Sequence, residues 1–494
     1  MPLDSSDGSV EDERRAPEWD LRFGFRNYRA LIVSQLLSSV LAFGSVWLLT
    51  RYLGAEGYGR VVALLAAAQL AAQLGVNWTM TAVARFGCQE FVESGSLAKS
   101  FWTRLAILVP NALLVVLTGD LWMPPVARWL RLPDPLLPLI ALLFLANVGW
   151  LHVQQALQAA KLPRLQGVLL ALERLQIVLV VLALVVAERI SAESVARAFV
   201  IAPSVASVIG LWRLRSLIAP AFSFDRRLLG SIVTFSLPLI PYSIVGYFST
   251  SYLDAFFVSR FLSTETLGVY AVAVQVSGTL MQPTVLAGSL LMPLFVTLQV
   301  TGREALVSRL FREVLPLGVL AWSLVCVVAG LAGTILLPAV FGAAFRESAR
   351  ALWPLLAASA VASPSLLGYA PLASARSLTG IGALSGLGAA AVNLGLNYLL
   401  IPRFGLVGCA WATCGAYAVS TVLAAGLLQR RIPGVRTSAY AASLPAVAAA
   451  CVHLRWESAL LTALATLSLT VPLLVLNRQK IRSTMTALAS LASR

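Results

Sequence analysis

The sequence has few charged residues and almost no histidine. Only 12% of its 494 residues are charged and two are histidine, whereas 59% are hydrophobic and the mean hydropathy is +0.83. A soluble chain of this length could not bury so much apolar surface. The low charge therefore excludes a soluble enzyme or binding domain and indicates a polytopic membrane protein.

Cysteine and histidine are also too sparse to build a metal centre. The two histidines, His152 and His453, lie far apart, and the five cysteines show no paired spacing typical of a disulfide framework or a metal cluster. A GxxxxGK[ST] phosphate-binding loop is missing as well, so we expect no ATP hydrolysis. The sequence predicts neither a cofactor nor a metal, and the cysteines are interpreted as small packed residues.

Long hydrophilic loops are absent between the apolar spans. A membrane polymerase, ligase or glycosyltransferase needs acid and base carboxylates held in a supported extramembrane constellation. Many helices joined by short loops favour transport instead. We therefore expect the protein not to be an enzyme.

What the chain does contain is a succession of apolar spans, each long enough to cross the roughly 30 Å of bilayer hydrocarbon as a helix. They predict an all-α polytopic membrane protein with about fourteen transmembrane helices. The first seven spans are 31–50, 61–83, 101–118, 136–156, 165–187, 195–212 and 229–250. The second seven are 268–296, 314–338, 350–370, 379–400, 407–428, 437–453 and 458–476.

The distribution of basic residues predicts the orientation. Most of the 37 lysines and arginines fall in the N-terminal segment, the C-terminal segment and the loops on the same side of the membrane. By the positive-inside rule, both termini are expected in the cytoplasm. Because topology accounts for much of the net charge of +15, the sequence gives no reason to expect nucleic-acid binding.

A nine-residue phrase occurs twice. RYLGAEGYG spans 51–59 and RFLSTETLG spans 260–268, which is 209 positions later, and both follow an apolar span. The same offset places Gln73 over Gln282. Because six helices separate the copies, the repeat is parallel, and the two halves are expected to be related by an axis along the membrane normal.

The repeat predicts the domain boundaries. We expect a disordered cytoplasmic tail at 1–29, an N-terminal bundle of helices 1–6 at 30–215, and a C-terminal bundle of helices 7–12 at 216–430. Residues 431–494 would hold helices 13 and 14 and a short cytoplasmic tail.

Polar residues inside the repeated helices are candidates for lining a cavity. In lipid such side chains must face protein or water, so they either line a cavity or hold helices together by hydrogen bonds. The candidates are Gln69, Gln73, Asn77 and Arg85 on helix 2 and Gln275 and Gln282 on helix 8. Arg85, at the inner end of helix 2, either meets an anion or is a topology signal.

Charges within spans are a stronger indication of function. Glu173 and Arg174 lie about 12 Å into helix 5 at 1.5 Å per residue. Such a charge costs about 2.5–3.5 kcal/mol without a partner or water. As neighbours they point about 100° apart, so each is expected to find a ligand or a mate on another helix; a structural ion pair is the alternative. Arg104 and Arg197, near span ends, are expected to reach the interface.

Helix 7 carries candidate gating residues. Pro238 and Pro241 are expected to bend it, and Asp254 lies near its outer end. A bent helix would help to open and close a gate.

Four stretches resemble the polysaccharide or oligosaccharide flippases of the multidrug/oligosaccharidyl-lipid/polysaccharide exporter superfamily. They are residues 31–86 with RYLGAEGYG, 224–273 with Pro238, Asp254 and Gly268-Val269-Tyr270, VFGAAFRESA at 340–349 and NLGLNYLLIPRFGLVGCAWAT at 393–413. The resemblance implies two bundles around a central cavity, with helices 1, 2, 7 and 8 as its portal and wall. It also implies that a polyprenyl-diphosphate-linked oligosaccharide is turned from the cytoplasmic to the outer leaflet by alternating access. The location would be a bacterial inner membrane.

Two other functions stay open. A cation-coupled multidrug exporter of the same superfamily would favour acidic residues in an apolar pocket, whereas the charges within spans here lean basic. A membrane polysaccharide polymerase or ligase belongs to a different class and would act on units already outside. Expected partners are the lipid-linked oligosaccharide, membrane lipids and, as a further candidate, polysaccharide synthesis enzymes.

Overall fold

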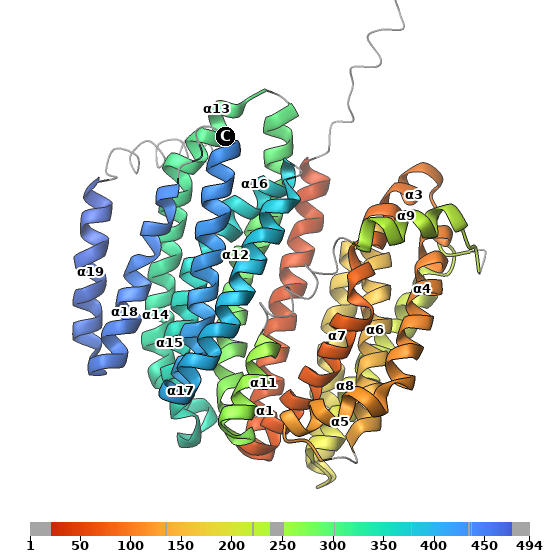
Figure 1. Cartoon of the computed structure of the whole chain (residues 1–494), viewed down its shortest axis with the longest axis horizontal. Coiled ribbons are helices and arrows are strands. Elements are labelled where there is room, and N and C mark those ends of the chain that lie inside the picture. Colours follow the sequence, from red (N-terminus) through yellow and green to blue (C-terminus); the bar gives the residue numbers. More distant parts are fainter. Residues whose placement is uncertain are drawn as a thin grey trace, which may run out of the picture.

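The computed structural model describes residues 21–476 apart from 134–135, 220–221, 238–250, 301, 377, 433–434 and 436. Within these residues all regular structure is helical, and most of the helices run side by side (Figure 1). This confirms the predicted all-α membrane fold.

The first half of the chain forms one long kinked helix followed by a series of shorter ones. Its elements are α1 (Leu21–Gly75), η2 (Asn77–Thr79), α2 (Met80–Ala82), η3 (Val83–Gly87), α3 (Cys88–Ser94), α4 (Ala98–Leu117), α5 (Gly119–Trp129), α6 (Leu137–Ala159), α7 (Pro163–Val186), α8 (Ala192–Leu214) and α9 (Arg226–Ser236).

The second half begins with a similar pair and ends in two peripheral helices. Its elements are α11 (Ser251–Phe261), α12 (Thr264–Val300), α13 (Glu304–Arg309), η6 (Leu310–Val314), α14 (Leu315–Phe341), η7 (Ala343–Phe345), α15 (Arg346–Pro364), η8 (Ser365–Tyr369), α16 (Ala370–Ala375), α17 (Thr379–Arg431), η9 (Thr437–Ser443), α18 (Leu444–Trp456) and α19 (Ala459–Leu476).

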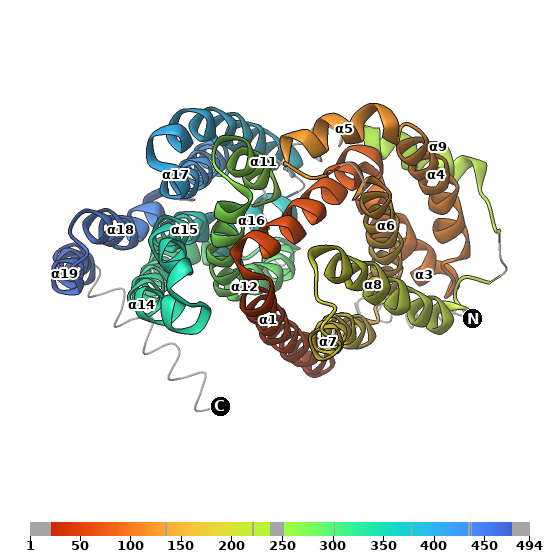
Figure 2. The same cartoon turned by 90° about the horizontal axis from the view of Figure 1, so that it is seen from below.

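The helices pack into two lobes. In the N-terminal lobe α1 contacts α6, α7 and α8, and in the C-terminal lobe α15 contacts α12, α14 and α17. The lobes meet where α1 packs along α12, and Figure 2 shows α1 running between them. The peripheral pair α18 and α19 packs on α14 and α15.

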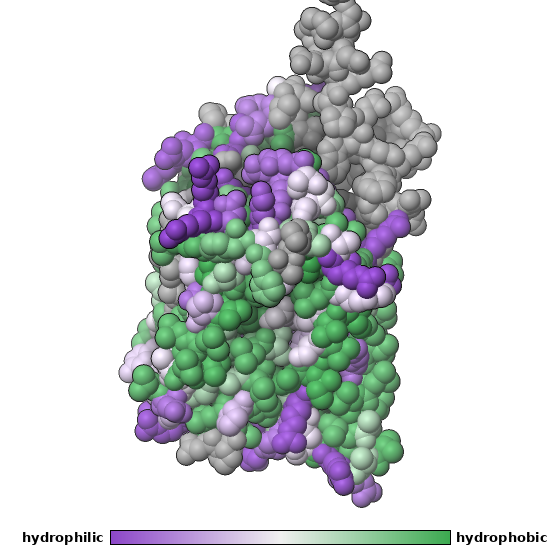
Figure 3. Space-filling view, turned by 90° about the vertical axis from the view of Figure 1, so that its right-hand side faces the viewer, coloured by the Kyte–Doolittle hydropathy of each residue, from purple (hydrophilic) through white to green (hydrophobic). Residues whose placement is uncertain are grey.

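Length and hydropathy make nine of the described helices candidate membrane spans. Two of them, within α1 and α17, each cover two predicted spans. The predicted span 229–250 lies partly outside the described residues. The last two predicted spans correspond to the shorter α18 and α19. Figure 3 shows the expected surface, an apolar belt with hydrophilic residues gathered toward both ends. Thirteen of the fourteen predicted spans therefore fall on described helices, and 229–250 is described only in its first part, which belongs to α9 (Arg226–Ser236).

Glycine turns the chain within both long helices. Gly54 (φ 68°) breaks α1 between the first and second spans, and Gly405 (φ 57°) breaks α17 between the eleventh and twelfth. A positive φ is strained for a residue with a Cβ but not for glycine. Each glycine thus lets two antiparallel spans follow each other without a loop.

The short helix α9 crosses the predicted division between the bundles. Residues 226–236 were expected to belong to the C-terminal bundle, at 216–430, yet α9 packs on α2, η2 and α4 of the N-terminal lobe. The packing boundary between the lobes thus falls after α9. The helix α5 is a further element that hydropathy did not indicate.

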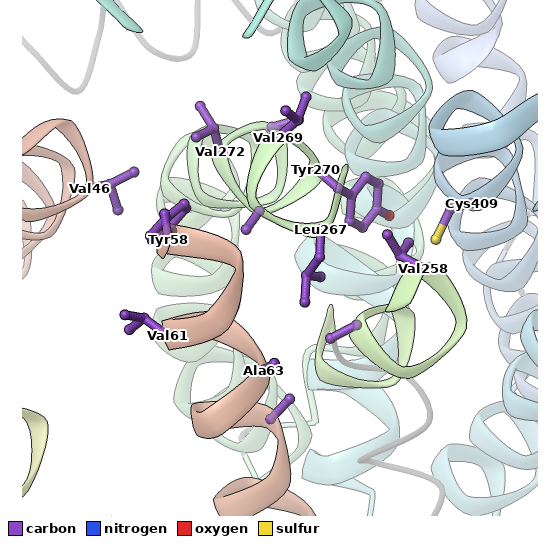
Figure 4. Close-up of a cluster of buried hydrophobic side chains, with 14 of the residues drawn as sticks. Val46, Tyr58, Val61, Ala63, Val258, Leu267, Val269, Tyr270, Val272 and Cys409 are labelled. Carbon is purple, nitrogen blue, oxygen red and sulfur yellow. The ribbon is translucent and has the colours of Figure 1, made fainter. Parts of the chain in front are cut away.

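The largest buried apolar cluster joins the two lobes. It includes residues of α1, α11, α12, α15 and α17. Figure 4 shows part of it, where the segment of α1 with Tyr58 and Val61 runs beside α12 with Val269 and Val272, and Tyr270 of α12 extends toward Cys409 of α17. The core therefore fixes α1 against α12, the two helices that border the polar cavities described next.

Candidate functional site: a polar cavity between the lobes

The two copies of the repeated phrase begin their helices differently. In the first copy Gly54 turns the chain into the second span. In the second copy Ser263 occupies the equivalent position, and its Oγ accepts a hydrogen bond from the Thr266 amide at 3.0 Å. A serine that accepts an amide of the first turn is a typical helix N-cap. Backbone freedom and side-chain capping thus give the same result, a helix that starts at this end of the molecule.

The last glycines of the two phrases meet. A Cβ on Gly59 would overlap the Thr264 carbonyl oxygen and lie 3.0 Å from the Gly268 nitrogen. A Cβ on Gly268 would overlap the Ala55 carbonyl oxygen and lie 2.9 Å from the Gly59 nitrogen. Only glycine permits backbones to approach this closely. The repeated phrase therefore forms a pseudo-symmetric crossing of α1 and α12, which we call the glycine crossing.

A polar cavity of about 270 Å³, the central cavity, lies next to this crossing. Tyr58 lies at the end nearest the crossing, and Gln69 lies further along α1. Its other polar lining comes from three more helices: Asn147 and Trp150 on α6, Glu173 and Arg174 on α7, and Gln275 on α12. Four of the predicted site residues, Gln69, Glu173, Arg174 and Gln275, thus line one cavity.

A second cavity of about 300 Å³ adjoins the first. The two share Ala42, Arg174 and Gln275 as lining residues. The second cavity is also lined by Gln282 and by Gln35 and by other polar residues of α1 and α12. Because the guanidinium of Arg174 borders both spaces, a ligand in either one would meet the same cation.

The ionisable residues of α7 divide into a buried carboxyl group and an accessible guanidinium group. The Glu173 side chain is 9% exposed, whereas the Arg174 side chain is 36% exposed. Their closest approach is 3.9 Å, between Arg174 Nε and a Glu173 carboxylate oxygen. This exceeds the usual 2.7–2.9 Å of a strong charged hydrogen bond. The neighbouring pair is therefore loosely associated, and Arg174 lines both cavities without a close carboxylate contact among the described residues.

The amide groups are already oriented by neighbours. Asn147 Nδ2 donates to Gln69 Oε1 at 2.8 Å, which leaves the Gln69 amide nitrogen as a donor. Gln275 Nε2 donates to the Thr279 hydroxyl at 3.2 Å, which leaves its carbonyl as an acceptor. Fixed donors and acceptors beside one cation form a surface suited to hydroxyl groups and an anion.

Three predicted residues lie elsewhere. Asn77 of η2 donates to the Gln73 side chain of α1 at 3.0 Å, so these two form a local pair beyond Gln69. Arg85 lines a separate groove beside α9. The proposed gating residues Pro238 and Pro241 fall outside the described residues.

Asp254 occupies the C-terminal lobe, away from the central cavity. Its carboxylate accepts hydrogen bonds from the Tyr270 hydroxyl (2.8 Å), the Thr413 hydroxyl (3.1 Å) and Asn397 Nδ2 (3.2 Å). It also borders a cavity of about 310 Å³ with Asn393. A buried carboxylate facing a cavity can carry a proton or be neutralised by a small cation.

Sequence reasoning missed the partners of Asp254 and the two meeting glycines. Asn393 and Asn397 are spaced i, i+4 in an apolar helix, a signal equivalent to the one used for Gln69 and Gln73. Gly59 and Gly268 end the repeated phrase, so the repeat itself held the signal.

The expectation for Arg104 was wrong. Its side chain was predicted to reach the membrane interface, but the residue is only 2% exposed. Its Nη1 lies 2.9 Å from His152 Nδ1, and its Nε donates to the Thr79 hydroxyl at 3.3 Å. The distance of Arg104 from the end of its span gives its depth along the helix, but it does not tell which face of the helix packs against α6. Arg104 lies on the packed face, so its side chain is buried. Arg197, by contrast, is exposed.

The second cavity is lined from both lobes, by α1, α7 and α12, and a polar site where two similar halves meet is typical of membrane transporters. The family is identified by sequence, because the model of the polysaccharide biosynthesis protein family matches residues 25–299, more than half of the chain. The chain belongs to that family, which confirms the resemblance drawn from the sequence.

Solved structures share the fold. The lipid II flippase MurJ in an inward closed conformation superposes with a TM-score of 0.68 over 91% of this chain and 99% of that one, at 13% identity. The MATE multidrug transporter DinF-BH superposes with a TM-score of 0.56 over 83% of this chain and 96% of that one, at 14% identity. An inward-facing MATE transporter of the MOP superfamily superposes with a TM-score of 0.54 over 84% of this chain and 98% of that one, at 15% identity.

These neighbours are flippases and transporters, in agreement with the prediction that the chain is not an enzyme. A search among curated protein sequences finds no match. The comparisons establish a lipid-flippase or exporter fold in a multi-pass membrane protein.

Proposed function

We propose that this protein moves polyprenyl-diphosphate-linked oligosaccharide units from the cytoplasmic to the outer leaflet of a bacterial inner membrane, by alternating access. The units would serve cell-surface polysaccharide synthesis, and the synthesis enzymes would be neighbours in the membrane. Both termini would lie in the cytoplasm, as the basic residues predict.

The observation that carries the proposal is the position of Arg174. Arg174 lines both adjoining cavities, and its nearest carboxylate oxygen, on Glu173, is 3.9 Å from its Nε. A guanidinium presents a planar fork of donors that matches phosphate oxygens. Amides of Gln69 and Gln275 supply the partners that sugar hydroxyls need. The same site therefore suits a diphosphate joined to sugars.

Only the headgroup of such a substrate needs shelter from hydrocarbon, because its prenyl tail is as apolar as the lipid. The cavities of about 270 and 300 Å³ lie at or below the lower end of the roughly 300–1,000 Å³ typical of small-molecule sites. An oligosaccharide headgroup therefore requires the lobes to move apart. The glycine crossing is a junction between the lobes where such a movement would begin.

The proposal is tested by locating the lipid-linked units in cells that lack the gene. We expect the units to accumulate on the cytoplasmic leaflet, protected from a membrane-impermeant glycosidase or lectin, and a plasmid copy should restore access. Units that stay fully accessible in the deletion strain, with short or unjoined chains, would instead support a polymerase or ligase.

A second candidate function rests on Asp254. The cavity beside its carboxylate is lined by Tyr417, Met281 and Leu355, an arrangement that suits an organic cation. A multidrug exporter would lower the cellular accumulation of a cationic dye, and Asp254→Asn would abolish this effect. Unchanged dye accumulation on deletion of the gene would exclude this function.

A further inference from the structure

A groove outside the central cavity combines cations, hydroxyls and aromatic rings. It lies between η3, which supplies Arg85 and Phe86, and α9, which supplies the remaining lining residues: Arg227, Gly230, Ser231, Thr234 and Phe235. We call it the α9 groove. It is a shallow groove, open to the outside, with a volume of about 600 Å³, and none of its lining residues is acidic.

The helix α9 is fixed in place by specific contacts. Asp225 caps it by accepting the amides of Arg227 (2.8 Å) and Leu228 (3.1 Å). The Asp225 amide in turn donates to the Thr103 hydroxyl of α4 at 3.1 Å. On the opposite face of the helix Ile232 is buried, whereas the residues toward the groove are mostly exposed. The helix is therefore amphipathic, and Figure 1 shows it lying across the end of the N-terminal lobe where α3 also lies.

The two arginines are arranged to receive an anion. The guanidinium of Arg85 lies 4.6 Å from the Phe235 ring centroid and 5.5 Å from that of Phe86, which holds the side chain over the groove. Among the described residues neither Arg85 nor Arg227 forms a salt bridge. Asp225 is the described carboxylate nearest to Arg227 and is occupied in capping α9. Two guanidinium groups that form no salt bridge in the described part of the chain, together with the hydroxyls of Ser231 and Thr234, match the charge and the acceptor oxygens of a diphosphate.

The groove and the central cavity are lined by the same stretch of chain. Gln69 of α1 lines the cavity, and Arg85 of η3, sixteen residues later, lines the groove. The polar pair Gln73 and Asn77 lies between them. The irregular helical turns η2 and η3 in this segment are the kind of helix distortion that is frequent at functional sites.

We propose that the α9 groove is a surface binding site for the diphosphate of the lipid-linked substrate, occupied before the headgroup enters the central cavity. The inference rests on the proposed function and adds a second site to it. Arg85 and Arg227 would bind the phosphates at the membrane surface, while the prenyl tail stays in the adjacent lipid. Arg174 would bind the same diphosphate only after the headgroup has moved inward.

The test measures binding of radiolabelled farnesyl diphosphate to the full-length protein in nanodiscs of neutral lipid. Arg85→Gln combined with Arg227→Gln should weaken binding by about tenfold or more, since charge-assisted hydrogen bonds are lost. Arg226→Gln is the matched control, because Arg226 is adjacent on α9, is exposed and does not line the groove. It should change binding less than about twofold, as expected for a screened surface charge.

Two further measurements separate this site from the transport site. In a flipping assay the double variant should need a higher substrate concentration yet approach the wild-type maximal rate, whereas Arg174→Gln should lower the maximal rate. If the wild type flips the substrate and the double variant binds and transports it as well as the wild type does, the groove proposal fails and the proposed function stands. Absence of flipping by the wild type would overturn the proposed function instead.

Competitors identify the chemistry of the ligand. Farnesyl monophosphate and inorganic diphosphate should compete more weakly than farnesyl diphosphate, since each lacks either a phosphate or the apolar tail. Phosphatidylglycerol in the nanodiscs tests for a general phospholipid site. If it displaced radiolabelled farnesyl diphosphate from the wild type but not from the double variant, at a concentration below that of the farnesyl diphosphate, the proposal would fail.

Discussion

The glycine crossing supports a prediction about the conformational equilibrium. In Gly59→Ala the new methyl group would overlap the Thr264 carbonyl oxygen, which belongs to backbone and cannot rotate away. Overpacking of this kind costs about 1–3 kcal/mol. A conformation in which the lobes are apart at this end does not incur that cost. The population should therefore shift away from the closed crossing by roughly 5- to 150-fold, and Gly268→Ala should act in the same direction.

The shift can be measured by labelling a single cysteine at Val62, which lines the central cavity, in a background from which the native cysteines have been removed. A membrane-impermeant maleimide added on the side opposite the termini should react faster in Gly59→Ala than in the parent. Gly44→Ala is the control on the same helix, because nothing lies within 4 Å of a Cβ at Gly44. Labelling at the parental rate in both glycine-crossing variants, with the proteins intact by size-exclusion chromatography, would refute the reasoning.

Three other outcomes follow from the contacts described above. Arg174→Gln should reduce flipping at least tenfold while Arg197→Gln, an exposed charge, has little effect, as measured in proteoliposomes; equal loss in both would contradict a specific role. Asp254→Asn keeps the shape but removes the charge from its hydrogen-bond network, so transport should lose its dependence on an applied ion gradient, and an unchanged dependence would exclude a coupling role. The pKa of Asp225 is lowered by hydrogen bonds from backbone amides, first that of Leu228, and by nearby cations. The capping contribution of Asp225 is therefore fully present above its unfolded-state pKa and is lost as the pH falls through its lower folded-state pKa. The protection of α9 amides against hydrogen exchange should therefore be constant above about pH 5 in the wild type and weaker in Asp225→Ala, and equal protection in both would show that the cap is dispensable.

The helices could be predicted from the sequence because hydropathy and length are local properties. Lipid forces each apolar span into a helix regardless of its neighbours, so the predicted spans coincide with helices wherever the chain is described. The repeat also indicated that two similar halves exist. Whether two spans form one kinked helix, as at Gly54, depends on a single φ angle that a pattern of apolar residues does not contain.

The site could be predicted only in part because lateral packing is not local. Depth and polarity identified Gln69, Glu173, Arg174 and Gln275, whose shared cavity arises from the packing of α1, α7 and α12. The same criteria misplaced Arg104, whose helix face turns inward toward His152. They also could not show that Arg85 borders a separate groove, formed by the packing of α9.

Partners on distant helices were beyond the sequence for the same reason. Asp254 and Thr413 are 159 positions apart, yet the hydroxyl donates to the carboxylate at 3.1 Å. Only the fold brings α11, α12 and α17 together at this point. Polar residues in spans can therefore be selected from sequence, but their pairing needs coordinates.

The central claim is that the polar cavity between the lobes carries a sugar-diphosphate headgroup across the bilayer. Its most direct test is a proteoliposome assay with a fluorescent polyprenyl-diphosphate oligosaccharide whose outer-leaflet fraction is quenched by an impermeant reductant. The wild type should make the label in both leaflets accessible to the quencher, and Arg174→Gln should leave the inner-leaflet fraction protected. Equal protection in wild-type and protein-free vesicles would contradict the claim.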